Sequence, residues 1–254
     1  MSTTLLSVNL NKIALIRNSR EGNYPDVVQH GQICLDAGAD GLTVHPRPDQ
    51  RHIRPDDVLA LSERLKTKEG VEFNIEGNPH AEANGRYPGF MALVEQARPD
   101  QCTLVPDSDD QLTSDHGFDL TRSSETLKPI IAELQDFGCR VSLFMDPDLE
   151  QIDLARAVGA DRIELYTGPY AAAHKAHNSE LDALLDRYRL AARHAHEIGL
   201  GVNAGHDLNL DNLQEFLHIR GVDEVSIGHA LTVDALQMGL AAAVRAYLNI
   251  CRGG

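Results

Sequence analysis

Residues 33–45, ICLDAGADGLTVH, hold the pattern that decides the fold: a helix end, the tripeptide Gly-Ala-Asp and then an apolar run. The same order returns at residues 155–166, ARAVGADRIELY, and two further apolar runs, 139–144 and 200–203, also follow a glycine. A glycine just after a helix commonly adopts the left-handed conformation that ends the helix. These four junctions therefore predict helices that alternate with strands.

Four more β-rich runs bring the number of predicted strands to eight. The predicted strands are Leu5–Asn9, Gly41–His45, Val71–Ile75, Gln101–Val105, Cys139–Phe144, Arg162–Tyr166, Leu200–Asn203 and Glu224–Ile227. Strands that alternate with helices form right-handed βαβ units and a parallel sheet. Eight such units predict a closed (β/α)8 TIM barrel, with residues 1–254 as a single domain. An open doubly wound sheet is the alternative, but no Gly-x-Gly-x-x-Gly motif follows the first strand.

The composition argues against several classes of protein. A formal net charge of -15 opposes non-specific binding to nucleic acid or to anionic membranes. Cys34, Cys102, Cys139 and Cys251 form no Cys-x-x-Cys pair, so we expect reduced thiols instead of disulfides or a zinc site. No apolar run is long enough to span a bilayer, and the N-terminus lacks the basic flank of a secretory signal. We therefore expect a cytoplasmic location.

Ionisable residues lie at the ends of predicted strands and within them. His45, His206 and His229 each end an apolar run, and Glu72 and Glu164 are carboxylates within strands. In a (β/α)8 barrel the C-terminal ends of the strands and the loops that follow them form the active site. A carboxylate inside an apolar run is costly to bury without a partner. This cost favours a functional or a paired role for Glu72. If Glu72 is desolvated among strand residues, we expect it to have a raised pKa and to act as a base.

The residues at this rim could bind either a metal ion or a phosphate. The sequence has no His-x-His pair on a strand and no His-Glu-x-x-His helix, so we expect no metal site. Cationic donors follow the first two strands, at residues 17–20, at Arg47 and at residues 51–52. Residues 205–207 and 228–230 follow the last two strands, where barrel enzymes commonly bind phosphate through backbone N–H groups. Two sets of donors predict two anionic groups in the substrates.

Nine strings of sequence extend from the first predicted strand to the last. They are Val8–Ala14, Arg17–Arg20, Gly38–Arg47, Arg51–Ile53, Leu104–Pro106, Val141–Phe144, Glu164–Gly168, Asn203–His206 and Ile227–Ala230. Their order and spacing together resemble the pyridoxine 5'-phosphate synthase family of the deoxyxylulose-dependent vitamin B6 route. The resemblance implies a (β/α)8 transferase with extra helices that forms a homo-octamer and needs no metal or organic cofactor. It implies condensation of 1-deoxy-D-xylulose 5-phosphate with 3-amino-2-oxopropyl phosphate to pyridoxine 5'-phosphate, with release of phosphate and water.

The resemblance also implies roles for individual residues. His45 and Glu72 resemble the proton acceptors, His206 resembles the proton donor, and Glu164 resembles a residue that stabilises a transition state. The residues that would hold the aminoketone phosphate are Asn9, Arg20, Asp207, Gly228 and His229. The residues that would hold deoxyxylulose phosphate are Asn11, Lys12, Arg47, His52 and Thr113.

The sequence departs from the family pattern after the first strand, where some members carry an Asp-His pair and this chain carries Asn11-Lys12. We expect Lys12 to bind phosphate as a point charge, and a Schiff base is the alternative.

Two other functions fit the same arrangement of residues. Another phosphosugar barrel enzyme, such as an aldolase or an epimerase, would convert a single phosphosugar without an amine. A non-catalytic phosphate-binding barrel would bind both ligands and release no phosphate.

Overall fold

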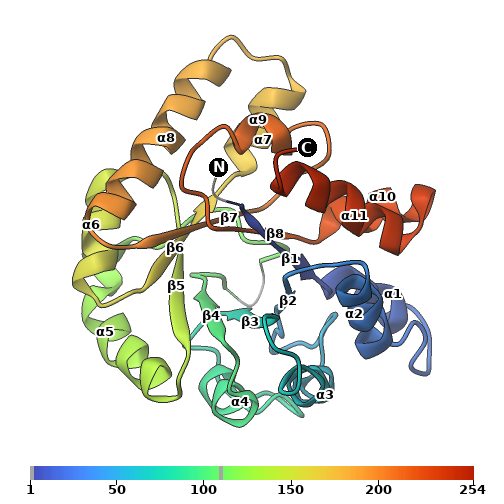
Figure 1. Cartoon of the computed structure of the whole chain (residues 1–254). Helices are drawn as coiled ribbons and strands as arrows, with labels where there is room; N and C mark the ends of the chain where they lie inside the picture. Colours follow the sequence, from blue (N-terminus) through green and yellow to red (C-terminus); the bar gives the residue numbers. More distant parts are fainter. Residues whose placement is uncertain (1–2, 109–110) are drawn as a thin grey trace.

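A closed barrel of parallel strands forms the centre of the computed structural model, which describes residues 3–108 and 111–254 (Figure 1). Within these residues eight strands pair in sequence order, and the last pairs with the first, so the sheet has no edge. The strands are β1 (Leu5–Asn9), β2 (Gly41–Val44), β3 (Glu72–Gly77), β4 (Gln101–Leu104), β5 (Arg140–Met145), β6 (Arg162–Tyr166), β7 (Gly201–Gly205) and β8 (Glu224–Ile227). The predicted (β/α)8 barrel is confirmed, and β1, β6 and β8 have the predicted bounds.

Helices cover the outside of the barrel (Figure 1). The described residues form α1 (Asn11–Asn18), α2 (Val27–Asp36), α3 (Pro55–Leu65), α4 (Phe90–Ala97), α5 (Leu120–Asp136), α6 (Leu149–Ala157), α7 (Gly168–Lys175), α8 (Leu181–Glu197), α9 (Leu213–Phe216), α10 (His229–Met238) and α11 (Leu240–Cys251). Two helices instead of one follow β1, β6 and β8, which confirms the extra helices. None of the helices in this part of the chain has the length and apolar character needed to cross a membrane.

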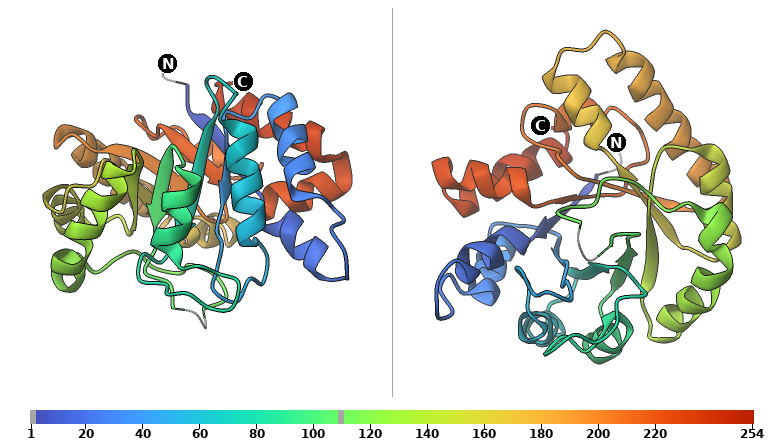
Figure 2. Two further views of the ribbon diagram at one scale, coloured as in Figure 1. Left: turned by 90° about the horizontal axis from the view of Figure 1, so that it is seen from below. Right: turned by 180° about the vertical axis from the view of Figure 1, so that it is seen from behind.

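The predicted glycine stops are present at the helix ends. Gly38 after α2 and Gly159 after α6 have φ angles of +106° and +95°, in the left-handed region that a side chain rarely adopts. The start of β1 and the C-terminal end of α11 lie on the side of the barrel opposite the loops that follow the strands (Figure 2, left). The barrel therefore has one end with the strand starts and one end with the βα loops.

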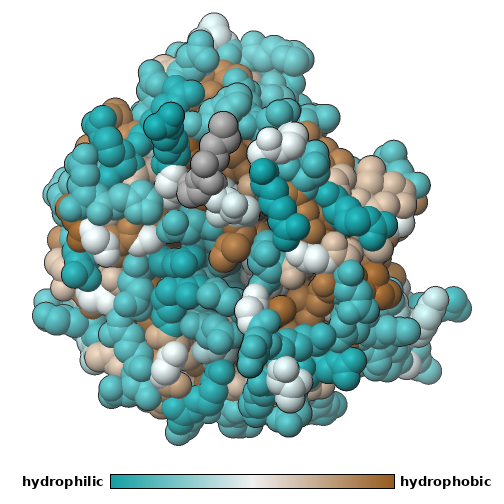
Figure 3. Space-filling model, in the orientation of Figure 1, coloured by the Kyte–Doolittle hydropathy of each residue, from teal (hydrophilic) through white to brown (hydrophobic). Residues whose placement is uncertain are grey.

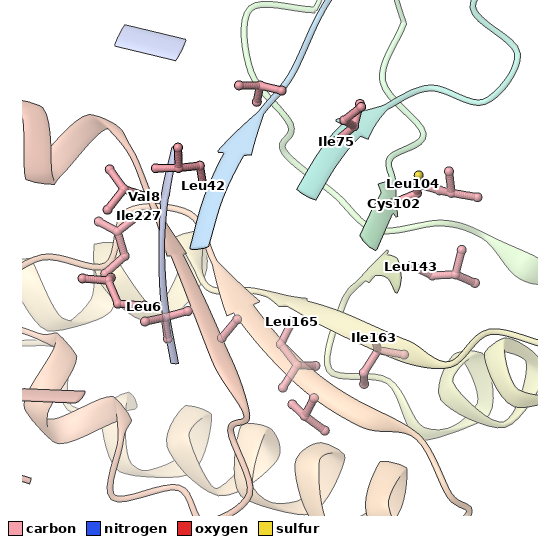
Figure 4. Close-up of a cluster of buried hydrophobic side chains, with 14 of the residues drawn as sticks. Leu6, Val8, Leu42, Ile75, Cys102, Leu104, Leu143, Ile163, Leu165 and Ile227 are labelled. Atoms are coloured by element: carbon pink, nitrogen blue, oxygen red, sulfur yellow. The ribbon is translucent and has the colours of Figure 1, made fainter. Parts of the chain in front are cut away.

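The two faces of each strand have different character, because successive side chains of a strand point to opposite sides. The outer faces supply the hydrophobic core between the strands and the helices, and examples are Leu6, Val8, Leu42, Ile75, Leu143 and Ile163 (Figure 4). The inner faces are polar instead. Ser7 and Thr43 share a hydrogen bond of 2.7 Å, and Arg162 donates to Asn203 at 2.8 Å. The barrel interior thus contains polar side chains, several of which are hydrogen-bonded to one another.

Four aspartates connect the starts of the strands in a repeating pattern. They are Asp40 before β2, Asp100 before β4, Asp161 before β6 and Asp223 before β8. Each carboxylate accepts the N–H of the second residue of the preceding strand, at 2.8 to 2.9 Å. Each aspartate carbonyl accepts the N–H of the first residue of the next odd-numbered strand, at 2.8 to 3.1 Å. The four residues therefore connect β1, β3, β5 and β7 into a closed ring of hydrogen bonds.

Replacing Asp223 with alanine removes the acceptor of the Val202 N–H, which lies 2.9 Å from the carboxylate. An unsatisfied strand N–H should lower the free energy of unfolding by about 1–3 kcal/mol. Asp223→Asn keeps a side-chain oxygen and should retain most of that stability. Urea unfolding followed by circular dichroism measures the difference. The control is Asp136→Ala on the exposed end of α5, and a loss no larger than that of the control would contradict the role of Asp223.

Candidate active site

A cavity of about 430 Å³ lies at the end of the barrel where the βα loops gather. Twelve of the fourteen predicted site residues line it: Asn9, Asn11, Lys12, His45, Arg47, His52, Thr113, Glu164, His206, Asp207, Gly228 and His229. Glu72 and Arg20 are outside the set of lining residues, and Glu76 and Arg51 belong to it. Arg20 is exposed in the segment after α1. The barrel therefore brings most of the predicted rim into one site.

Glu72 lies at the opposite end of the barrel, because it is the first residue of β3. Its carboxylate pairs with both terminal nitrogens of the Arg140 guanidinium. The hydrogen bond from Arg140 lowers the pKa of Glu72, against the opposing effect of partial burial. The prediction of a raised pKa for Glu72 is therefore wrong, and the structure gives this residue no place in the cavity.

Glu76, four residues further along β3, is the carboxylate that reaches the cavity. Its Oε2 atom lies 3.8 Å from His45 Nδ1 and accepts a hydrogen bond from Asn9 Nδ2 at 3.3 Å. Burial, with smaller effects from the Asp107 and Glu224 carboxylates, raises the pKa of Glu76 to about 8, against the attraction of Arg47. The Glu72 and Glu76 side chains both face the barrel interior, and they differ in how far each lies from the C-terminal end of β3.

His45 is held at the end of β2 by the residue that follows β1. The backbone N–H of His45 donates to Asn11 Oδ1 at 2.9 Å. Burial lowers the pKa of the His45 imidazole well below its usual value, and the neighbouring Arg47 acts in the same direction. His45 is therefore neutral near pH 7 and has a free nitrogen lone pair to accept a proton.

Arg47 and His52 lie on the same loop as His45. Burial lowers the pKa of His52 to about 3, and the Arg47 charge adds to this effect. The Nδ1 atom of His52 accepts the Ile53 N–H at 2.9 Å, so the proton of the neutral ring is on Nε2. Arg47 pairs with the buried Asp107 carboxylate and donates to the Gln111 carbonyl at 3.2 Å. The loop therefore presents N–H donors to the cavity.

Glu164 is a buried carboxyl on β6, with 4% of its surface exposed. Burial raises its pKa well above the usual value, and the Glu76 and Glu224 carboxylates add to that effect. Its Oε2 atom has no hydrogen-bond partner among the described residues. A Cβ atom on Gly205 would lie only 2.3 Å from Oε1, so the glycine leaves the space that this carboxyl fills. Glu164 is thus a neutral acid with a free donor.

His206 and Asp207 follow β7 with φ angles of +87° and +61°, a conformation that is unfavourable for residues with side chains. Thr167 holds this turn, since its hydroxyl donates to the carbonyls of Gly205 and His206. The imidazole Nδ1 atom of His206 lies 3.1 Å from Asp207 Oδ2, and its Nε2 atom lies 2.9 Å from Thr113 Oγ1. The strained turn therefore aims the imidazole at the cavity, between a carboxylate and the β4–α5 loop.

Cationic and backbone donors line the part of the cavity near β1 and β8. The Lys12 ammonium has neither an ion pair nor a hydrogen bond within residues 3–108 and 111–254, so it is available to an anion. Helix α10 begins at His229, directly after Gly228, and its first N–H groups suit a phosphate. A Cβ atom on Gly228 would lie 2.9 Å from the Asn9 side chain.

No group of three or more histidine, cysteine, aspartate or glutamate side chains in the described residues is arranged to hold a metal ion. The site combines histidines of lowered pKa, carboxyls of raised pKa and cationic side chains.

The chain matches known proteins over nearly its whole length. The family described as pyridoxal phosphate biosynthesis protein PdxJ matches residues 6–253. The chain belongs to the PdxJ family. A pyridoxine 5'-phosphate synthase from Xanthomonas campestris pv. campestris is 58% identical over 99% of this chain and 98% of its own. The enzyme of the same name from Xylella fastidiosa is 56% identical over 97% of this chain and 94% of its own.

Solved structures show the wider distribution of the fold that this PdxJ member adopts. A 3-keto-L-gulonate-6-phosphate decarboxylase from Vibrio cholerae has a TM-score of 0.62 at 12% identity and covers 98% of both chains. A phosphoribosyl anthranilate isomerase has a TM-score of 0.56 at 13% identity and covers 99% of this chain and 100% of its own. At these identities the likeness concerns the barrel alone.

The raised pKa of Glu76 predicts a pH-dependent effect on stability. An unfolded glutamate has a pKa of about 4.5, and the folded value is about 8, so the folded chain binds more protons between these values. The stability from this group is present in full below about pH 4.5 and is lost as the pH rises through 8. Glu76→Gln copies the neutral form, so it should raise the Tm more at pH 8 than at pH 5.

Differential scanning calorimetry of the wild type and the Glu76→Gln variant at both pH values measures this difference. Glu125→Gln, at an exposed position on α5, is the matched control and should shift the Tm equally at both pH values. An equal shift for Glu76→Gln would disagree with a buried, protonated carboxyl.

Proposed function

We propose that this cavity condenses 1-deoxy-D-xylulose 5-phosphate with 3-amino-2-oxopropyl phosphate and releases pyridoxine 5'-phosphate, phosphate and water. Membership of the PdxJ family and 58% identity to a pyridoxine 5'-phosphate synthase support the proposal. The observation that carries it is the meeting of His45, Glu76 and His206 in one cavity that also holds cationic donors. Such a set suits several proton transfers on anionic substrates.

We assign the two phosphates to the two donor sets. Deoxyxylulose phosphate is held by the donors near β1, β2 and the β4–α5 loop: Asn11, Lys12, Arg47, His52 and Thr113. The aminoketone phosphate is held by the donors near β1, β7 and β8: Asn9, Asp207, Gly228 and His229. Arg20 lies outside the cavity of this chain, so this assignment leaves it out.

His45 and Glu76 act as the proton acceptors in this scheme, with Glu76 in place of Glu72. The substrate amine attacks the ketone carbon, a C–N bond forms, and the nitrogen loses its proton as water leaves. A later step removes a carbon-bound proton as phosphate is expelled. His45 is neutral because of the lowered pKa of its imidazole. Glu76 accepts a proton through the fraction that is ionised near neutral pH, and its pKa of about 8 makes this carboxylate a stronger base than ordinary glutamate.

His206 and Glu164 supply protons and hydrogen bonds. His206 faces the cavity from the turn after β7 and protonates the departing oxygen. Glu164 remains neutral because burial raises its pKa, so it can donate a hydrogen bond to the negative oxygen that develops during ring closure. Ring closure forms a C–C bond by aldol-type attack, and loss of water then completes the aromatic ring.

We also place the chain in the cytoplasm and in a homo-octamer. Four unpaired cysteines suit a reducing compartment. Apolar side chains are exposed on α1, at Leu15 and Ile16, and on α10, at Val233, Leu236 and Met238. Helices α1 and α10 are in contact, and apolar surface is visible on the side where they lie (Figure 3). Contact with a second copy would bury this surface.

Substitution of the most exposed of these side chains tests self-association. Leu236 is 77% exposed, so Leu236→Lys should reduce the assembled mass in sedimentation velocity without lowering the Tm by more than a few degrees. A sedimentation coefficient equal to that of the wild type would exclude Leu236 from the contact.

The reaction itself is tested by mixing the purified protein with both substrates. Pyridoxine 5'-phosphate absorbance and inorganic phosphate should appear together, with and without a chelator. Glu76→Gln and His206→Asn should each lower kcat by about 10²–10⁴-fold, since each removes an acid or base group. Glu72→Gln should retain kcat within about threefold, because its partner Arg140 lies away from the cavity.

Other outcomes separate the remaining functions. Conversion of deoxyxylulose phosphate without the amine would indicate an aldolase or epimerase. Binding of both substrates without phosphate release would indicate a binding protein. Full turnover by Glu76→Gln would contradict the role of that carboxyl.

A further inference from the structure

We propose that Arg17 and Asn18, the last two residues of α1, are positioning residues for the loop between β2 and α3. This loop, residues 45–54, presents Arg47, Arg51 and His52 to the cavity. Arg17 and Asn18 do not line the cavity and act on the substrate only through the loop. The proposal rests on the proposed function, because it concerns the binding of one of the two phosphate substrates.

Arg17 is a fully buried cation with a partner for each guanidinium nitrogen. Its side chain has 0% of its surface exposed. Nη1 pairs with the Asp57 carboxylate, Nη2 donates to the His52 carbonyl at 2.9 Å, and Nε donates to Asn18 Oδ1 at 3.0 Å. A lysine in its place has one nitrogen and cannot reproduce this planar set of donors.

Asn18 holds three consecutive carbonyl groups of the loop. Its Nδ2 atom donates to the carbonyls of Gln50, Arg51 and His52, at 3.2, 3.0 and 2.8 Å. Its Oδ1 atom accepts from Arg54 Nη2 at 2.7 Å. The Asn18 amide thus fixes the backbone of Arg51 and His52 and with it the position of their side chains.

Asp57 holds the far end of the same loop. Its Oδ2 atom accepts the Arg54 N–H at 2.8 Å at the start of α3, while Oδ1 pairs with Arg17. The loop is therefore fixed between α1 and α3. A buried ion pair is a weak source of stability, because desolvation of both charges offsets their attraction. The fixed direction of its hydrogen bonds, however, defines the position of the loop.

Helix α1 connects this network to the first donors of the cavity. Asn11 and Lys12 at the start of the helix line the cavity, and Asn11 also bonds the His45 N–H. Arg17 and Asn18 at its end hold residues 50–52. The short helix therefore connects Lys12, on one side of the cavity, with the loop that carries Arg51 and His52 on the other.

Two variants test the inference. Arg17→Lys keeps the charge beside Asp57 and loses the bond to the His52 carbonyl or to Asn18. Asn18→Ala leaves the Arg17–Asp57 pair in place and removes the bonds to three carbonyls. We expect each variant to raise the KM for deoxyxylulose phosphate about tenfold. We expect the KM for 3-amino-2-oxopropyl phosphate to stay within about twofold and kcat within about threefold.

The control is Arg140→Lys, which weakens another arginine–carboxylate pair, at the opposite end of the barrel. It should lower the Tm without changing either KM. The proposal would be overturned if Arg17→Lys and Asn18→Ala lowered the Tm but left both KM values unchanged. It would also be overturned if the KM values for the two substrates rose equally.

Isothermal titration calorimetry with deoxyxylulose phosphate alone keeps this test independent of turnover. The dissociation constant should rise about tenfold in both variants and stay constant in Arg140→Lys. If the wild type binds this ligand but forms no product, the proposed function fails while the titration still tests the loop. If both variants bind as tightly as the wild type, the positioning role is excluded.

Discussion

Hydrogen bonds that four aspartates accept from strand N–H groups are the constraint on which the rest of this structure depends. Asp40, Asp100, Asp161 and Asp223 occupy the same place before every second strand and connect the odd-numbered strands into a ring. With the strand starts fixed at one end, the opposite ends point into a common space. The loops there carry the chemistry, because their own packing does not have to close the barrel.

The polar interior of the barrel explains the behaviour of the acid and base groups above it. Glu76 and Glu164 face this interior, where burial and the charges of neighbouring carboxylates raise the pKa of each carboxyl. At the other end Arg140 lowers the pKa of Glu72. Glu224 lies at this same end and has a raised pKa although Arg162 Nη1 is 3.7 Å from its Oε2, because burial outweighs the attraction. The pKa of each carboxyl thus depends on the balance between its burial and the charges and hydrogen bonds beside it. Glutamates of one barrel can therefore be weak acids with a raised pKa or ions in a structural pair, according to their position.

The sequence was sufficient for the strands and for most of the rim, because helix stops and strand periodicity are local signals. Position along a strand was harder to predict. Glu72 and Glu76 lie on the same face of β3. The predicted strand ended at Ile75, which placed Glu76 directly after it at the rim, and this position is the signal that favours Glu76 as the site residue. The carboxylate bonds of the Gly-Ala-Asp aspartates and the partners of Arg17 are tertiary contacts. The two partners of each of these bonds lie 20 to 40 residues apart in the sequence, so periodicity could not reveal them.

The aspartate ring also shows how the barrel could be divided for protein engineering. It divides the barrel into four equal quarters, each with two strands and one aspartate, and the boundary between β8 and β1 uses the same bonds as the other three. The junction between β8 and β1 is therefore one of four junctions with the same hydrogen-bond pattern. Each quarter of this barrel is a unit with the same aspartate hydrogen bonds at its strand starts, while the loops after its strands can differ in sequence and length.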